Sequence, residues 1–143
     1  EDQVRLIKTY KRVLPKEVLY ILGPVRNNWD RDINGEFQAL DFFVNNLNKF
    51  EIPKDIKICL RLHPSEMKNK YHNWIKQNSN LNLIIDNKNS LAESIGRATW
   101  VVGCESYGLI LALKAKKLVL STLPPWAHRC RLPYEGIIHL RDL

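Results

Sequence analysis

The stretch Gly103-Cys-Glu-Ser-Tyr-Gly108 combines a flexible backbone with polar side chains, directly before an apolar run typical of a helix. Gly103 permits a tight turn from a strand into that helix. The free N–H groups at a helix start, together with the positive end of the helix dipole, favour a phosphate group. Ser106 would add a hydroxyl donor, and the carboxylate of Glu105 suits the two vicinal hydroxyls of a ribose. The structural alternative is that Glu105 complements the dipole and Ser106 caps the helix.

A second candidate is the stretch Arg61-Leu-His-Pro-Ser-Glu66. A histidine fixed by a following proline can donate a ring N–H to a phosphate or sugar oxygen, and its titration near neutral pH also allows acid–base chemistry. A lone histidine such as His63 is more often structural, bonded to a carbonyl or a helix end. Both stretches are expected at one edge of a sheet, and this favours the functional interpretation.

Other polar residues carry weaker signals. Arg26 follows the first predicted strand and could meet a diphosphate or an acceptor, although charged loop residues are usually only solvated. His128, Arg129 and Arg131 follow the fifth predicted strand, where we expect a solvated turn rather than an anion site. The sequence contains no glycine-rich dinucleotide or P-loop motif and no set of paired metal ligands. We therefore expect no metal and no separate cofactor, and we assign no catalytic residue.

Composition excludes several classes of protein. Hydrophobic residues make up 45% of the chain and charged residues 26%, which excludes a disordered chain. No apolar run approaches the roughly 18 residues of a membrane-spanning helix. Lys and Arg outnumber Asp and Glu by 22 to 15, but they are scattered, which argues against nucleic acid as a partner. Cys59, Cys104 and Cys130 lie far apart, which favours reduced thiols in the cytoplasm over a zinc site or disulfides.

The two candidate stretches need a framework, and the hydrophobic pattern supplies one. Short apolar runs predict six strands, at 17–23, 57–63, 81–85, 100–103, 118–120 and 136–140. Three- and four-residue steps predict a helix over 37–50, begun by capping chemistry at Asn34 and ended by Pro53. Further helices are expected near 71–75, after a capping box at Ser90 and Glu93, and over 107–115.

Alternation of strands and helices is typical of crossover units with parallel strands. Runs that are apolar on both faces, such as 100–102 and 118–120, need helices on both sides. We therefore predict an α/β fold: a Rossmann-like, doubly wound, mainly parallel six-stranded sheet with helices on both faces. Such sheets bind ligands beyond the carboxyl ends of their strands, where the strand order reverses. This indicates the loops after the first, second and fourth strands.

A chain of 143 residues is expected to form a single domain, 1–143. It begins within a helical pattern at Val4, Leu6, Ile7 and Tyr10, and it stops directly after a predicted strand. We therefore expect a fragment of a larger, two-domain protein.

The residues also resemble a known family. The stretch from Gly103 to Val119 resembles the donor site of GT-B-type glycosyltransferases, and the stretch from Arg61 to Glu66 resembles the His-Pro loop of bacterial sialyl-, polysialyl- and Kdo-type transferases. The resemblance extends from Glu17 to Leu140, as the C-terminal Rossmann-like half of such enzymes. It implies that His63 contacts the donor phosphate and that Glu105 faces the ribose. The phosphate-binding set it implies is Gly103, Ser106, Tyr107 and Gly108, with Arg26, Arg61 and Glu66 as secondary positions.

The implied function is donor binding in a nucleotide-sugar-dependent glycosyltransferase of hexosyl or sialyl/Kdo type, in bacterial surface-polysaccharide or glycan biosynthesis. The donor would be a CMP- or UDP-type sugar and the acceptor a glycan or a lipid-linked glycan. The resemblance also implies a missing N-terminal domain, so the isolated half need not be active. We expect a cytoplasmic location, with peripheral contact at the inner face of the membrane as an option. Two alternatives stay open: a nucleotide-sugar epimerase or hydrolase of this architecture, and a non-catalytic module that binds a phosphosugar or nucleic acid.

Overall fold

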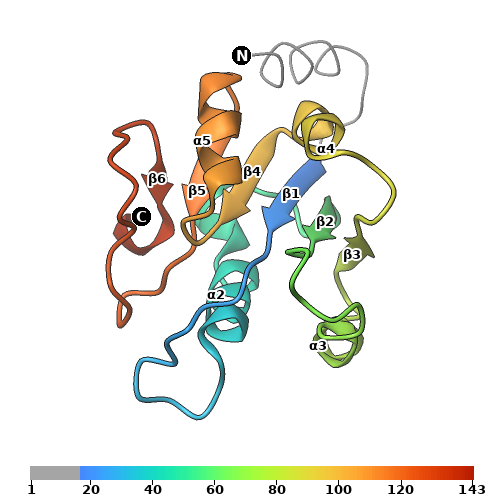
Figure 1. Ribbon diagram of the computed structural model, residues 1–143, viewed down its shortest axis with the longest axis vertical. Coiled ribbons are helices and arrows are strands. Elements are labelled where there is room, and N and C mark those ends of the chain that lie inside the picture. Colours follow the sequence, from blue (N-terminus) through green and yellow to red (C-terminus); the bar gives the residue numbers. More distant parts are fainter. Residues whose placement is uncertain (1–16) are drawn as a thin grey trace.

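A single six-stranded sheet organises the protein. The computed structural model describes residues 17–143, so the helical pattern predicted at residues 4–10 lies outside the described part. The strand order is β3-β2-β1-β4-β5-β6, and all five neighbouring pairs are parallel (Figure 1). The order reverses between β1 and β4, which are the first strands of the two halves of the sheet. This is the doubly wound α/β arrangement predicted from the sequence.

The elements follow the hydrophobic pattern of the chain. The strands are β1 (Glu17–Ile21), β2 (Lys57–Arg61), β3 (Asn82–Ile85), β4 (Trp100–Gly103), β5 (Leu118–Ser121) and β6 (Ile138–His139). The α-helices are α2 (Gly35–Val44), α3 (His72–Gln77), α4 (Leu91–Arg97) and α5 (Tyr107–Lys114). Two 3₁₀ turns, η1 (Leu47–Phe50) and η2 (Leu140–Asp142), complete the described elements.

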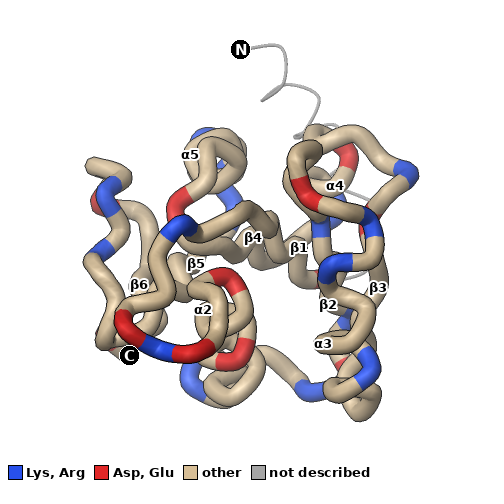
Figure 2. The backbone as a smooth tube through the Cα atoms, turned by 60° about the horizontal axis from the view of Figure 1, so that its bottom comes forward, with Lys and Arg blue, Asp and Glu red and all other residues tan. Residues whose placement is uncertain are grey.

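Helices cover both faces of the sheet, as predicted, and each face has its own hydrophobic core. Side chains alternate along β1, so Val18 and Tyr20 pack on the face of α2 and α3, whereas Leu19 packs on the face of α4 and α5. Figure 2 shows the two pairs of helices on opposite sides of the strands. The same view shows Lys and Arg spread over loops and helix ends, among Asp and Glu.

Three local expectations need correction. The helix predicted over 37–50 ends at Val44, because the side chain of Asn46 donates to the Phe42 carbonyl at 2.7 Å and takes the place of a helical backbone bond. Asn34 begins α2 without a side-chain capping bond. The sixth strand is only two residues long, because the chain turns into η2 at Leu140.

The predicted cap at Ser90 is confirmed, since its hydroxyl accepts a hydrogen bond from the backbone N–H of Glu93 at 3.1 Å. The Glu93 carboxylate accepts from the Ser90 hydroxyl rather than from a backbone donor, so only half of the expected capping box is formed. Within residues 17–143, no helix has the length and apolar character needed to cross a bilayer.

Candidate functional site at the switch point of the sheet

Parallel pairing brings three candidate loops to one edge of the sheet. Ile21, the last residue of β1, is in register with Arg61 of β2 on one side and with Gly103 of β4 on the other. The chain leaves all three strands at this edge, so the loops after β1, β2 and β4 lie next to one another. They adjoin the point where the strand order reverses, which is where ligands of such sheets bind.

The His-Pro loop after β2 fixes the orientation of an exposed histidine. The backbone N–H of Ser65 donates to His63 Nδ1 at 3.1 Å, and the Ser65 hydroxyl lies 2.7 Å from the same atom. Because a backbone N–H can only donate, Nδ1 is the acceptor, and the neutral ring carries its proton on Nε2. The loop therefore presents His63 as an N–H donor, which is the role expected of a phosphate ligand.

Glu66 acts inside this loop rather than on its surface. Its side chain is only 2% exposed and accepts hydrogen bonds from Lys70 Nζ at 2.8 Å, the Tyr71 hydroxyl at 2.5 Å and the His63 N–H at 2.9 Å. Burial alone would raise the pKa of Glu66, but these three donors outweigh burial and hold the pKa below its ordinary value. Glu66 thus fixes the loop that carries His63.

The two secondary arginines have different surroundings. Arg61 donates to Asp86 at 3.3 Å and to the Asn89 carbonyl at 2.9 Å, so it ties β2 to the loop after β3. Arg26 is exposed on the loop after β1, and it has no hydrogen bond or ion pair within residues 17–143. Of the two, only Arg26 has a guanidinium group free to meet a ligand.

The loop after β4 packs tightly against β1. A Cβ atom on Gly103 would lie 2.9 Å from the Ile21 carbonyl oxygen, and one on Gly108 would lie 2.4 Å from Ile21 Cδ1. The absence of side chains at these two positions lets the start of α5 approach the centre of the sheet edge. Tyr107, the first residue of α5, is 65% exposed.

Ser106 stands at the N-cap position of α5 but makes no capping bond. Its Oγ is buried and has no hydrogen-bond partner among the described residues. A buried hydroxyl without a partner is uncommon in folded proteins and calls for an explanation such as a missing ligand or water. The structural alternative for Ser106, a side-chain cap, is therefore not what this geometry shows.

Glu105 joins the loop after β4 to the loop after β5. Its carboxylate accepts from the Arg131 side chain at 2.6 Å, the Arg131 backbone N–H at 2.9 Å and His128 Nε2 at 3.1 Å. Burial alone would raise the pKa of Glu105, but the donors of Arg131 and His128 lower it below its ordinary value. The segment 126–131, expected to be a solvated turn, thus brings His128 and Arg131 to the candidate site.

Replacing Glu105 by alanine should loosen this segment. The loss of three hydrogen bonds is partly offset by solvation of the exposed Arg131, so we expect the segment to open more often, by a factor of about 5 to 30. Trypsin cleavage after Arg129 and Arg131 would measure this opening. Glu135→Ala, which removes an exposed acid with no bond among the described residues, should leave the cleavage rate unchanged, and equal rates in both variants would contradict the anchoring role of Glu105.

The loop after β1 adds an aromatic residue that sequence reasoning did not single out. Trp29 and Asp30 both adopt positive φ values, 51° and 61°, a conformation rare for bulky residues. The Asn27 side chain accepts from the backbone N–H of Trp29 at 2.7 Å, the Asn28 side chain accepts from the backbone N–H of Asp30 at 3.2 Å, and both bonds stabilise this turn. The Trp29 ring lies 6.1 Å from that of His128, and its Nε1 is buried without a partner among residues 17–143.

Cys104, the residue after β4, is not a nucleophile. Burial raises the pKa of Cys104 to about 12, with the Glu105 charge adding to the effect, so the thiol stays protonated at neutral pH. In the described part of the chain, no three His, Cys, Asp or Glu side chains gather closely enough to hold a metal ion. The groups available to a ligand at this site are therefore N–H and O–H donors and the guanidinium groups of Arg26 and Arg131, which are groups that bind anions.

Comparison with solved structures identifies the fold. Over 96% of its length, the chain superposes on the Thermosulfurimonas dismutans KpsC β-Kdo 2,4 transferase with a TM-score of 0.56 and 10% identity. The β-Kdo 2,7 transferase of the same organism's KpsC gives 0.56 and 17% over 95% of the chain. The chain shares its fold with part of each Kdo transferase. It spans less than half of either one, 46% and 42% respectively.

A third similar structure is the wall teichoic acid polymerase TagF, at 20% identity over 85% of this chain and 28% of TagF. Its TM-score is 0.46, a weaker similarity than that of the two Kdo transferases. No protein-family model matches the chain, and no curated protein matches it in sequence. The similarity to solved structures therefore concerns the fold alone.

Proposed function

We propose that the chain is the donor-binding half of a nucleotide-sugar-dependent glycosyltransferase that acts in polysaccharide or glycan biosynthesis. The observation that carries the proposal is the buried Ser106 hydroxyl, which has no partner at the start of α5, at the switch point of the sheet. A phosphate oxygen at this helix start would accept from Ser106 and from the first free N–H groups of α5. The shared fold with two Kdo transferases supports the same class of substrate.

The negative charge that develops on the nucleotide sugar during transfer gives a role to the other polar groups of the site. When a glycosyl group leaves its nucleotide, negative charge grows on the departing phosphate, and donors fixed in advance stabilise it. The Nε2–H of His63 comes from the neighbouring loop, where Ser65 and Glu66 hold the ring and the backbone. Arg131, held by Glu105, keeps further guanidinium N–H groups that can donate to the phosphate from the loop after β5.

Glu105 then has a second role besides the ribose contact implied by the family resemblance. A carboxylate offers about four acceptor positions, and three are taken within the described residues. One position is left for a ribose hydroxyl. In this proposal Glu105 positions Arg131 first and contacts the sugar of the nucleotide second.

Calorimetry of the chain with CMP, CDP, UDP and GDP tests the proposal. We expect at least one of these nucleotides to bind, and His63→Ala or Ser106→Ala to weaken binding by a factor of about 10 or more, as for a hydrogen bond to a charged group. His72→Ala and Ser79→Ala remove the same groups from exposed positions on and after α3 and should leave binding unchanged.

Two results would overturn the donor-site assignment. One is that none of the four nucleotides binds to a chain that is folded by circular dichroism. The other is that all four variants bind like the parent. Release of free sugar from a bound nucleotide sugar without any acceptor would favour the epimerase or hydrolase alternative instead.

A further inference from the structure

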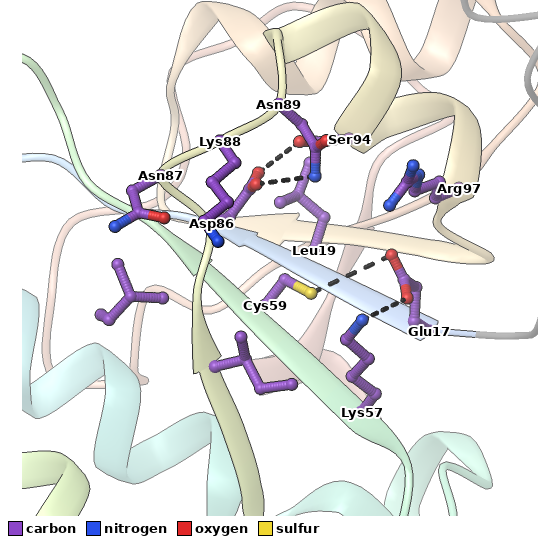
Figure 3. Close-up of a pocket in the computed structure, with 12 residues that line it drawn as sticks. Glu17, Leu19, Lys57, Cys59, Asp86, Asn87, Lys88, Asn89, Ser94 and Arg97 are labelled. Atoms are coloured by element: carbon purple, nitrogen blue, oxygen red, sulfur yellow. Dashed lines mark hydrogen bonds and ion pairs between the residues drawn. The ribbon is translucent and has the colours of Figure 1, made fainter.

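A pocket lies on the face of α4, away from the loop 103–108. On this face α4 and α5 cover β1, β4 and β5, whereas no helix among the described residues covers Ile84 of β3, which is 41% exposed. The result is a pocket of about 360 Å³ between β1–β3, the loop after β3 and α4 (Figure 3). Its lining is Glu17, Leu19, Lys57, Cys59, Ile84, Ile85, Asp86, Asn87, Lys88, Asn89, Ser94 and Arg97.

The floor of the pocket is apolar and chemically inert. Leu19, Cys59 and Ile84 come from three adjacent strands and point to this face of the sheet. Burial raises the pKa of Cys59 to about 11, and the negative charge of Glu17 adds to this effect. The thiol is therefore protonated at neutral pH and acts as packing surface for a ligand rather than as a nucleophile.

The two acids of the pocket already have partners. The Asp86 side chain is 4% exposed and accepts from Arg61 at 3.3 Å, from Asn89 at 3.2 Å and from the Ser94 hydroxyl. Glu17 is 8% exposed and pairs with Lys57 at 3.6 Å. Within the pocket these carboxylates are neutralised by neighbouring cations, so they do not repel an anion as free acids would.

Two cations of the pocket have no such partners. The Arg97 Nε is buried without a hydrogen-bond acceptor, and neither Arg97 nor Lys88 forms an ion pair among residues 17–143. Figure 3 shows them on opposite sides of Ser94, with the Asn87 and Asn89 amides on the same loop as Lys88. A buried guanidinium donor without an acceptor is costly unless an anion satisfies it.

We propose that this pocket binds a small phosphate-bearing molecule, with its phosphate on Arg97 and Lys88 and its body over the floor. Guanidinium groups match phosphate oxygens in geometry, and a phosphate dianion balances two cations. The volume is that of sites for small organic ligands. This ligand is additional to the nucleotide sugar, because the pocket shares no residue with the loops that carry His63 and Ser106.

Titration of the ¹⁵N-labelled chain with inorganic phosphate, followed by NMR, tests this site. We expect saturable shifts at the amides of residues 86–89 and 94–97, resolved from any shifts at residues 103–108. Arg97→Gln should weaken binding at the first set by tenfold or more. Lys54→Gln removes one charge from an exposed position outside the pocket and should have no effect.

Lys88→Gln provides a second variant on an exposed loop, so the test does not depend on how well Arg97→Gln folds. It should also weaken phosphate binding at residues 86–89 and 94–97, while nucleotide binding stays at the parent level. Shifts confined to residues 103–108, an absence of saturable shifts, or equal losses in Lys54→Gln would each overturn the proposal. Failure of nucleotide binding, by contrast, would leave the phosphate result intact.

Discussion

Replacing Glu66 by alanine is expected to lower the free energy of unfolding by about 2 to 4 kcal/mol, as when one partner of a buried ion pair is removed. The change takes the acceptor from Lys70, from the Tyr71 hydroxyl and from the His63 N–H. Lys70 keeps Glu36 as a partner, which limits the loss. Urea denaturation measures the change in stability. The NMR signals of His63 should also show that its loop is no longer held in one conformation.

The pH dependence of this loss has a defined sign. The pKa of Glu66 is lowered in the folded chain, so its stabilisation is complete above the pKa of an unfolded glutamate, about 4.3. It disappears as the pH falls through the lowered pKa, and parent and variant should then converge. Glu135→Ala is the control at an exposed acid. A loss in Glu66→Ala no larger than in this control would show that the buried contacts do not hold the loop.

The second large effect is expected for Gly35→Ala at the start of α2. A Cβ atom there would lie 2.4 Å from the Asn27 carbonyl oxygen, 2.7 Å from Val25 Cγ1 and 2.9 Å from the Trp29 ring. Because the nearest of these atoms is backbone, the loop after β1 has to move as a whole. We expect a loss of about 1 to 3 kcal/mol, as for other overpacked positions, together with weaker nucleotide binding.

Gly23→Ala is a matched control on the same loop. A Cβ atom at Gly23 meets no other atom within 4 Å, so this change should cost little stability. Thermal unfolding of the two variants tests the comparison. If Gly35→Ala unfolds at the parent temperature, the contact between α2 and the loop after β1 is looser than its geometry indicates.

Most of the fold could be predicted from the sequence because its signals are local. The apolar runs around Val101 and Val119 are typical of strands buried on both faces, and the three- and four-residue steps from Phe37 through Leu40 to Val44 are typical of a helix. The break after Val44 could not be read in this way. It depends on the side chain of Asn46 competing for a helical carbonyl, a choice that the hydrophobic period does not encode.

The sequence predicts that the candidate loops share one edge of the sheet, but it does not predict the contacts between them. Strand ends indicated the loops of His63 and Ser106, because parallel strands bring their carboxyl ends to one edge. Glu105 and Arg131 lie in separate loops, and no local sequence pattern predicts the contact between them. One feature of the sequence indicates Trp29 as a residue of the site: it lies in the loop after the first strand, beside Asn27 and Asn28.

The central place of β1 bears on how the chain acquires its sheet during synthesis. β1, β2 and β3 leave the ribosome first and can pair while β4 is still being made, which leaves one side of β1 as an open template. Val18 then has to pair with Trp100, which lies far along the chain beyond β2 and β3, and pairing over such a separation is slow. The proposed nucleotide site at α5 would form only after this step, so nucleotide binding would report the end of folding and not its beginning.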